Sequence, residues 1–114
     1  LYRERLSDID GLNIPFTNNN DTSSHHIFPV LLGKDIDRFE FMTHLKDKGI
    51  QSSIHYPPIH KFKFYRENFK NSKDLLSITE DITKREVTLP LYPSMSDGDI
   101  SYVCEMIKEY LTKR

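Results

Sequence analysis

Residues 26–56 read HIFPVLLGKDIDRFEFMTHLKDKGIQSSIHY and place a helix between two extended segments. Residues 26–32 are nearly all apolar, which is typical of a strand buried on both faces. Pro29 has no backbone N–H, so one side of this strand should be unpaired or bulged there. In residues 50–56, apolar and polar side chains alternate, with His55 pointing away from the face that holds Ile50. Pro57-Pro58 then ends this second predicted strand.

The segment between the two strands, residues 35–48, has the periodicity of an amphipathic helix. Its predicted buried face holds Ile36, Phe39, Phe41, Met42 and Leu45. Its predicted solvated face holds Asp37, Glu40, His44 and Asp47. Gly49 follows directly, as expected for a residue that caps a helix in the left-handed conformation.

Upstream of this segment, residues 1–9 have helical spacing of apolar side chains, and Gly11 predicts where that helix stops. Residues 12–16 are extended, and Pro15 suggests an edge strand. Residues 17–24, TNNNDTSS, read as a polar loop whose composition suggests mobility.

Downstream, residues 61–73 read as irregular or briefly helical. Ser77 and Glu80 fit a capping box for a helix that runs to about Glu86 and buries Ile78 and Ile82. Residues 87–92 turn extended. Ser96 should cap the last helix, whose predicted buried stripe is Ile100, Val103, Ile107, Tyr110 and Leu111. Short strands separated by helices predict one α+β domain over residues 1–114, with a small, mainly antiparallel sheet and helices mostly on one face.

The composition excludes several classes of function. The 114 residues allow one modest core, and 16 basic against 17 acidic residues are spread without a basic block, so nucleic acid is not an expected partner. No apolar run approaches the ~18 residues that span a bilayer, and no signal peptide is recognisable, so no membrane association is expected. The single cysteine, Cys104, lies on the apolar stripe of the last helix as a small buried hydrophobe. It suits a reducing compartment and hence a cytoplasmic location.

The candidate site is residues 54–60, IHYPPIH, where His55 and His60 flank a turn stiffened by two prolines. A histidine in such a loop can donate or accept a hydrogen bond near neutral pH, next to a phosphate or a sugar hydroxyl. The alternative is that both are ordinary loop histidines. Lys61, Lys63, Tyr65 and Arg66 form either a solvated rim or a contact surface for the phosphates of a nucleotide-sugar. No spacing of histidines, cysteine and carboxylates predicts a metal site.

Several segments, in this order, resemble the C-terminal domain of the DegT/DnrJ/EryC1/StrS family of pyridoxal-phosphate (PLP)-dependent sugar aminotransferases. The matching segments are His26-Ile27-Phe28, Gly49-Ile50, the HYPPIH run from His55 to His60, Tyr65, Thr79-Glu80, and LPLYPSMS at residues 89–96. The resemblance covers practically the whole chain.

The resemblance implies that this chain is the active-site-covering fragment of an enzyme that moves an amino group from glutamate to a keto-sugar nucleotide, in polysaccharide biosynthesis. PLP and its Schiff-base lysine would belong to an N-terminal domain that is absent here, so no PLP, catalytic residue or activity is expected in this chain alone. The resemblance assigns substrate contacts to His60, His55, Tyr56 and Tyr65. It also implies that the parent enzyme is a homodimer.

The alternative to a fragment is a free-standing small α+β binding or regulatory domain. The sequence begins at Leu1 without an initiator methionine, which favours the fragment. In the fragment, Leu1, Tyr2, Leu6 and the aromatic residues from Phe62 to Phe69 are expected to face the missing domain and to be partly exposed.

Overall fold

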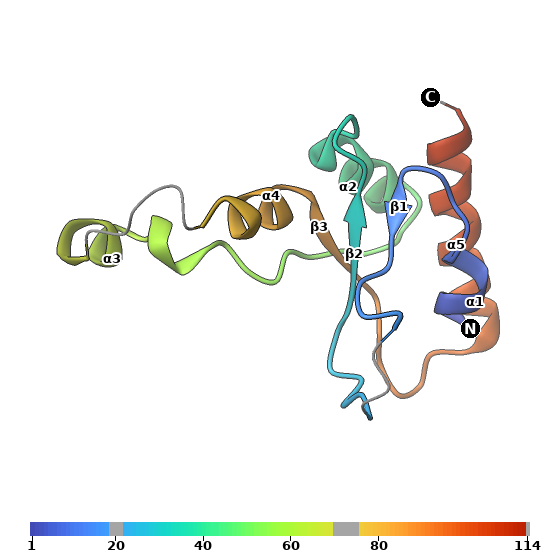
Figure 1. Ribbon diagram of the computed structural model, residues 1–114. Coiled ribbons are helices and arrows are strands. Elements are labelled where there is room, and N and C mark those ends of the chain that lie inside the picture. The colour runs from blue at the N-terminus through green and yellow to red at the C-terminus, as the bar shows by residue number, and fades with distance from the viewer. Residues whose placement is uncertain (19–21, 70–75, 114) are drawn as a thin grey trace.

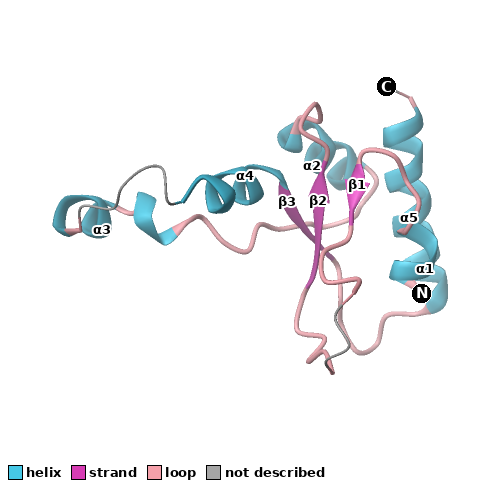
Figure 2. Cartoon of the chain, viewed as in Figure 1, coloured by secondary structure: helices cyan, strands magenta, loops and turns pink. Residues whose placement is uncertain are grey.

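The computed structural model describes residues 1–18, 22–69 and 76–113. In the described part, a three-stranded sheet has the order β1 (Leu12–Asn13), β2 (Phe28–Leu32), β3 (Glu86–Leu89), and both pairs are antiparallel. Figure 2 shows this sheet in the middle of the molecule with helices around it. The α+β fold with a small antiparallel sheet is therefore confirmed.

The central strand, β2, is buried mainly on one face. Val30 and Leu32 have no exposed surface, whereas Pro29 and Leu31 are half-buried, so the expectation of burial on both faces is wrong. Pro29 lies opposite Thr88 of β3, while β1 pairs only with Leu31 and Leu32. The side of Pro29 that faces away from β3 is thus unpaired, as its missing N–H predicts.

Three helices surround the core: α1 (Tyr2–Leu6), α2 (Arg38–Asp47) and α5 (Asp97–Thr112). Their buried side chains meet those of the sheet in one cluster, listed in order as Tyr2, Leu6, Leu12, Ile14, Val30, Leu32, Ile36, Phe41, Leu45, Ile50, Val87, Leu89, Val103, Cys104 and Ile107. The predicted stripe of α5 and the burial of Cys104 are confirmed, with Ile100, Tyr110 and Leu111 partly buried against the cluster. Tyr2 and Leu6 are buried in this core, where α1 contacts α5, so the expected exposure is wrong for these two residues, whereas Leu1 is 46% exposed as expected.

Helix α2 begins where the side chain of Asp37 accepts the backbone N–H of Glu40 at 2.9 Å, and Gly49 follows with φ +75° as predicted. Phe41 is fully buried, but Phe39 is 80% exposed, which contradicts its assignment to the buried face. The reason is geometric, because two residues along a helix turn the side chain by about 200°.

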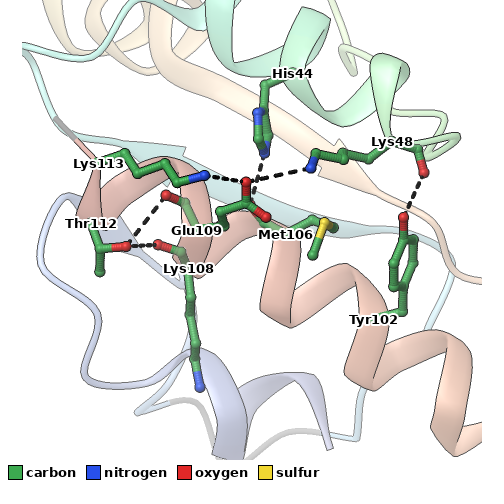
Figure 3. A network of polar contacts seen from close by, with 8 residues as sticks. All are labelled: His44, Lys48, Tyr102, Met106, Lys108, Glu109, Thr112 and Lys113. Atoms are coloured by element: carbon green, nitrogen blue, oxygen red, sulfur yellow. Dashed lines mark hydrogen bonds and ion pairs between the residues drawn. The ribbon is translucent and has the colours of Figure 1, made fainter.

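The contact between α2 and α5 also corrects the expectation for His44. Its Nε2–H donates to the carbonyl of Met106 at 3.1 Å (Figure 3). Its ring also lies 5.3 Å from that of Tyr110, so His44 is half-buried rather than solvated. Next to it, Lys48 Nζ lies 3.4 Å from Glu109 Oε1, and the Tyr102 hydroxyl donates to the Lys48 carbonyl at 3.0 Å. Polar contacts thus flank the apolar packing of these two helices.

Residues 50–56 do not form the predicted strand. Only Ser53 bridges to β3, through two backbone hydrogen bonds with Thr88 of 3.1 and 2.8 Å. Ile50 is buried, but Tyr56 is 67% exposed, so the alternation of faces does not continue to the end of the segment. This stretch follows the edge of β3 and shares backbone-to-backbone hydrogen bonds with it only at Ser53.

An arm leads away from the sheet and carries η1 (Ile59–Lys61), α3 (Lys63–Asn68) and α4 (Ser77–Arg85) (Figure 1). These elements confirm the briefly helical stretch as far as it is described; residues 70–73 of that prediction, like residues 19–21 of the polar loop, lie outside the described residues. Arg85 anchors the end of α4 by donating from Nη1 to the Leu32 carbonyl at 2.5 Å.

The predicted start of α4 is wrong. Leu76 is the N-cap residue and makes no side-chain cap, while Ser77 lies inside the helix. The Glu80 carboxylate binds His60 and Lys61 instead of returning to the helix start. Ile78 and Ile82 are 75% and 39% exposed, not buried, because α4 belongs to the projecting arm. In the described part of the chain, no helix has the length and apolar character needed to cross a membrane.

Candidate functional site

A cavity of about 490 Å³ opens beside β3, between the segment that follows α2 and the start of α5. One wall is polar and contains Gln51, Ser52, Ser53, His55 and Thr88. The lining also contains large apolar side chains, namely Leu89, Leu91, Tyr92, Met95 and Val103. A hollow lined by apolar surface and a few hydrogen-bonding groups is typical of a small-molecule site.

His55 stands on the polar wall and is held there by β3. Its backbone N–H donates to Glu86 Oε2 at 3.0 Å, and its ring Nδ1 lies 2.9 Å from Thr88 Oγ1 and 3.3 Å from Ser53 Oγ. The Thr88 hydroxyl in turn donates to Glu86 Oε1 at 2.5 Å. The imidazole is therefore fixed at one end by a buried polar pair.

The sequence reasoning missed Glu86 and Thr88, although both are buried, with 6% and 5% exposure. The sequence did contain a signal for them. In a strand, side chains alternate between two faces, so in EVTL Glu86 and Thr88 share one face and Val87 and Leu89 share the other. A glutamate and a threonine on the same face of a buried strand require polar partners, and His55 provides them.

His60 lies outside this cavity, on η1 in the arm. Its Nε2 is 3.0 Å from Glu80 Oε1, and Lys61 Nζ is 3.1 Å from Glu80 Oε2. Hydrogen bonds from His60 and then from Lys61 lower the pKa of the Glu80 carboxyl, because both favour its charged form. His60 is thus oriented by α4 rather than by the core.

The two predicted tyrosines also differ in surroundings. Tyr56 is exposed and meets the His55 ring edge to face, with 4.7 Å between the ring centroids. Tyr65 on α3 is 41% exposed and stacks on Phe69 at 5.8 Å. The structure therefore brings His55 and Tyr56 together, and places His60 and Tyr65 along the arm and away from the lining of the cavity.

The residues around the cavity test whether it fits a metal or PLP. Among the described residues, no group of three histidine, cysteine, aspartate or glutamate side chains could hold a metal ion. The described lining of the cavity includes neither a lysine, which a Schiff base requires, nor an arginine for the cofactor phosphate. This cavity does not fit PLP.

Two relatives and a solved structure are similar over nearly the whole chain. The dTDP-4-dehydro-2,3,6-trideoxy-D-glucose 4-aminotransferase of Saccharopolyspora spinosa is 34% identical over 105 residues, which is 91% of this chain and 26% of the relative. The spore coat polysaccharide biosynthesis protein SpsC of Bacillus subtilis is 30% identical over 112 residues, 95% of this chain and 29% of SpsC. Helicobacter pylori PseC, an aminotransferase involved in the biosynthesis of pseudoaminic acid, superposes with a TM-score of 0.87 at 20% identity, over 99% of this chain and 30% of PseC.

The chain thus spans less than a third of the length of the proteins that it matches, and its fold is that of the C-terminal portion of fold-type I aminotransferases. A family model, described as the DegT/DnrJ/EryC1/StrS aminotransferase family, matches residues 1–108. The chain belongs to the DegT/DnrJ/EryC1/StrS aminotransferase family.

Proposed function

We propose that this chain is the C-terminal, active-site-covering part of an enzyme that transfers an amino group from glutamate to a keto-sugar nucleotide. Glutamate becomes 2-oxoglutarate, and the ketone of the sugar becomes an amine. The match of residues 1–108 to the family carries this proposal. The relative from S. spinosa is a sugar 4-aminotransferase by name, which supports the sugar substrate.

PLP supplies the electron sink of such a reaction when it is bound. The residues that hold it are proposed to lie in an N-terminal domain outside this chain, since the described cavity does not fit the cofactor. The complete protein is proposed to be a cytoplasmic homodimer that acts in polysaccharide biosynthesis, as the name of SpsC suggests.

Within this chain, the proposed substrate contacts form two groups. His55 lines the cavity and Tyr56 packs against its ring, and an imidazole and a phenol can bind the hydroxyl groups of a sugar. His60 and Tyr65 lie on the arm, beside the cations Lys61, Lys63 and Arg66, which suit a diphosphate. A nucleotide-sugar offers both kinds of chemistry.

The complete protein encoded by the reading frame that contains this chain provides the test. It is incubated with PLP, glutamate and a keto-sugar nucleotide, and the products are identified by mass spectrometry. We expect a glutamate-dependent amino-sugar nucleotide and an equal amount of 2-oxoglutarate. Absence of glutamate-dependent amination for every keto-sugar nucleotide in a panel would overturn the proposal.

The 114-residue chain alone is the matched control. With PLP, it should show no aldimine absorption band and no lysine that becomes labelled after borohydride reduction. A stoichiometric aldimine on one of its own lysines would contradict the assignment of the cofactor to another domain.

A further inference from the structure

We propose that Glu86 and Thr88 are positioning residues that hold the His55 imidazole in the tautomer with its proton on Nδ1, which leaves Nε2 as a hydrogen-bond acceptor at the cavity wall. The use of that acceptor by a sugar hydroxyl rests on the proposed function. The tautomer itself follows from the hydrogen bonds of β3 alone.

The backbone N–H of His55 is a donor that cannot act as an acceptor. The backbone N–H of His55 donates to Glu86 Oε2 at 3.0 Å. The second oxygen of the same carboxylate, Oε1, lies 2.5 Å from Thr88 Oγ1. An ionised carboxylate only accepts, so the proton of the Thr88 hydroxyl must lie on this contact.

The direction of the next bond is then fixed. A hydroxyl group has one proton, and Thr88 gives it to Glu86. Toward His55 Nδ1, at 2.9 Å, Thr88 Oγ1 can therefore only accept, so Nδ1 must carry a proton. In a neutral imidazole, the other nitrogen, Nε2, then has a free lone pair.

The surroundings keep this arrangement in place. Glu86 and Thr88 are both buried, so water does not replace their bonds, and a broken link would leave a buried polar atom unsatisfied. Ser53 Oγ, at 3.3 Å from Nδ1, is exposed, and its hydroxyl can accept the same proton. In the described part of the chain, Nε2 of His55 has no hydrogen-bond partner, so it is available to a ligand.

The consequence concerns ligand chemistry. A neutral His55 with the proton on Nδ1 accepts a hydrogen bond at Nε2 and donates none there. The polar wall therefore prefers a ligand that presents a donor, such as a hydroxyl group, at this point. A carbonyl or phosphate oxygen would be accepted only after the imidazole takes up a proton.

The tautomer can be measured directly on the 114-residue chain by NMR spectra that correlate the ring nitrogens of His55 with its carbon-bound protons, at a pH at which the ring is neutral. We expect a protonated Nδ1 and an unprotonated Nε2. A wild-type ring with its proton on Nε2 would overturn the proposal.

Substitution of Glu86 by glutamine gives the sharper test, because it should reverse the tautomer. The amide oxygen of Glu86→Gln must face the backbone N–H of His55, which is a fixed donor, so its NH2 group faces Thr88. Thr88 then accepts from the amide and donates its own proton to Nδ1, and the ring proton moves to Nε2. An unchanged tautomer in a folded Glu86→Gln protein would contradict the proposed role of Glu86 and Thr88.

Two nearly isosteric variants keep the test decisive if Glu86→Gln does not fold. Thr88→Val removes the hydroxyl and should give a mixture of both tautomers, whereas Thr88→Ser should preserve the Nδ1–H form. Ser53→Ala is the matched control, because it removes the longer contact between Ser53 Oγ and His55 Nδ1, and it should leave the tautomer unchanged. Loss of the preference in Ser53→Ala but not in Thr88→Val would assign the role to Ser53 instead. None of these results depends on the substrate, so they stand or fall separately from the proposed activity.

Discussion

His55 and His60 are separated by four residues, yet the structure holds them in different ways. His55 is fixed against the buried strand β3 by Thr88 and Glu86, whereas His60 is held on the arm by a hydrogen bond with Glu80. The surroundings of His55 therefore change only if the buried core changes. The position of His60 depends instead on the contact between η1 and α4.

At His60, replacement by alanine in the complete enzyme should lower turnover with little effect on folding. Loss of one hydrogen bond to a sugar corresponds to about 0.5–1.5 kcal/mol, which is roughly a 2- to 10-fold decrease in rate. Steady-state kinetics and thermal denaturation would measure the two effects.

The control for that variant is Leu32→Ala, since Leu32 is fully buried in β2 and should lose about 2–5 kcal/mol of stability. Ile54, which the predicted strand would have made a suitable control, is only half-buried. Full activity of His60→Ala, together with a loss of stability like that of Leu32→Ala, would make His60 a structural residue.

The hydrogen bond between His60 and Glu80 predicts a change in the titration of Glu80. Its lowered carboxyl pKa is caused first by the hydrogen bond from His60 and then by that from Lys61. In His60→Ala, the pKa of Glu80 should rise toward its ordinary value but stay below it, because Lys61 remains. Carboxyl-carbon NMR titration measures this. An unchanged Glu80 pKa would mean that the His60 contact is not populated in solution.

At the scale of elements, the start of α5 combines two bonds in a capping box. The Ser96 hydroxyl accepts the backbone N–H of Asp99 at 3.1 Å, and Asp99 Oδ2 accepts the backbone N–H of Ser96 at 2.8 Å. Ser96→Ala should therefore destabilise the protein by about 0.5–2 kcal/mol in urea denaturation. A stability equal to the wild type would show that water replaces the cap without cost.

The same cap predicts a dependence on pH. Hydrogen bonds from the Ser96 hydroxyl and then from its backbone N–H lower the pKa of Asp99 in the folded state. The resulting stabilisation is complete above the pKa of an unfolded aspartate and is lost as the pH falls through the lower folded value. Asp99→Asn should be less stable than the wild type at neutral pH, and the difference should shrink in acid. A difference that is constant with pH would contradict this origin.

Local signals predicted the elements whose causes are local. The cap at Ser96, the stripe of α5 and the stop at Gly49 depend on neighbouring residues in the sequence, and all three are confirmed. Ser77 failed as a cap because Glu80 has better partners in His60 and Lys61, which a pattern of four residues cannot reveal.

In the candidate site, too, the features with local causes were predicted and those that depend on distant partners were not. The sequence pointed to His55, because a proline-stiffened turn is visible in the chain itself. The alternation in EVTL marks Glu86 and Thr88 as one face of a strand, but it does not reveal which side chain they bind, since that depends on which segment lies beside β3. That segment, residues 50–56, pairs with the strand through the backbone of Ser53 alone and has no distinct sequence signature.

At the scale of the whole molecule, the arm displays large apolar side chains to solvent. Ile59, Phe62, Phe64 and Phe69 are between 47% and 64% exposed, and they lie on the elements that project from the sheet (Figure 1). Exposed apolar surface of this kind is usually covered by another protein surface. The expected exposure of the aromatic residues from Phe62 to Phe69 is thus confirmed where these residues are described.

The isolated chain should therefore self-associate as its concentration rises. Sedimentation velocity at several concentrations would show the association, and a dye that binds apolar surface would report the patch. Phe64→Ser combined with Phe69→Ser should reduce both signals. A strictly monomeric wild-type chain without dye binding would contradict the prediction.

The packing of α1 on α5 has a consequence for the synthesis of the chain. The Tyr2 hydroxyl donates to the Pro90 carbonyl at 3.0 Å, and Arg5 donates to the hydroxyl of Ser101, so the first helix needs partners that are translated more than eighty residues later. On the ribosome, Leu6 stays uncovered until α5 has left the exit tunnel. A chaperone that shields apolar segments can therefore bind α1 during this interval, and a premature stop codon before α5 would leave a product that proteases can recognise.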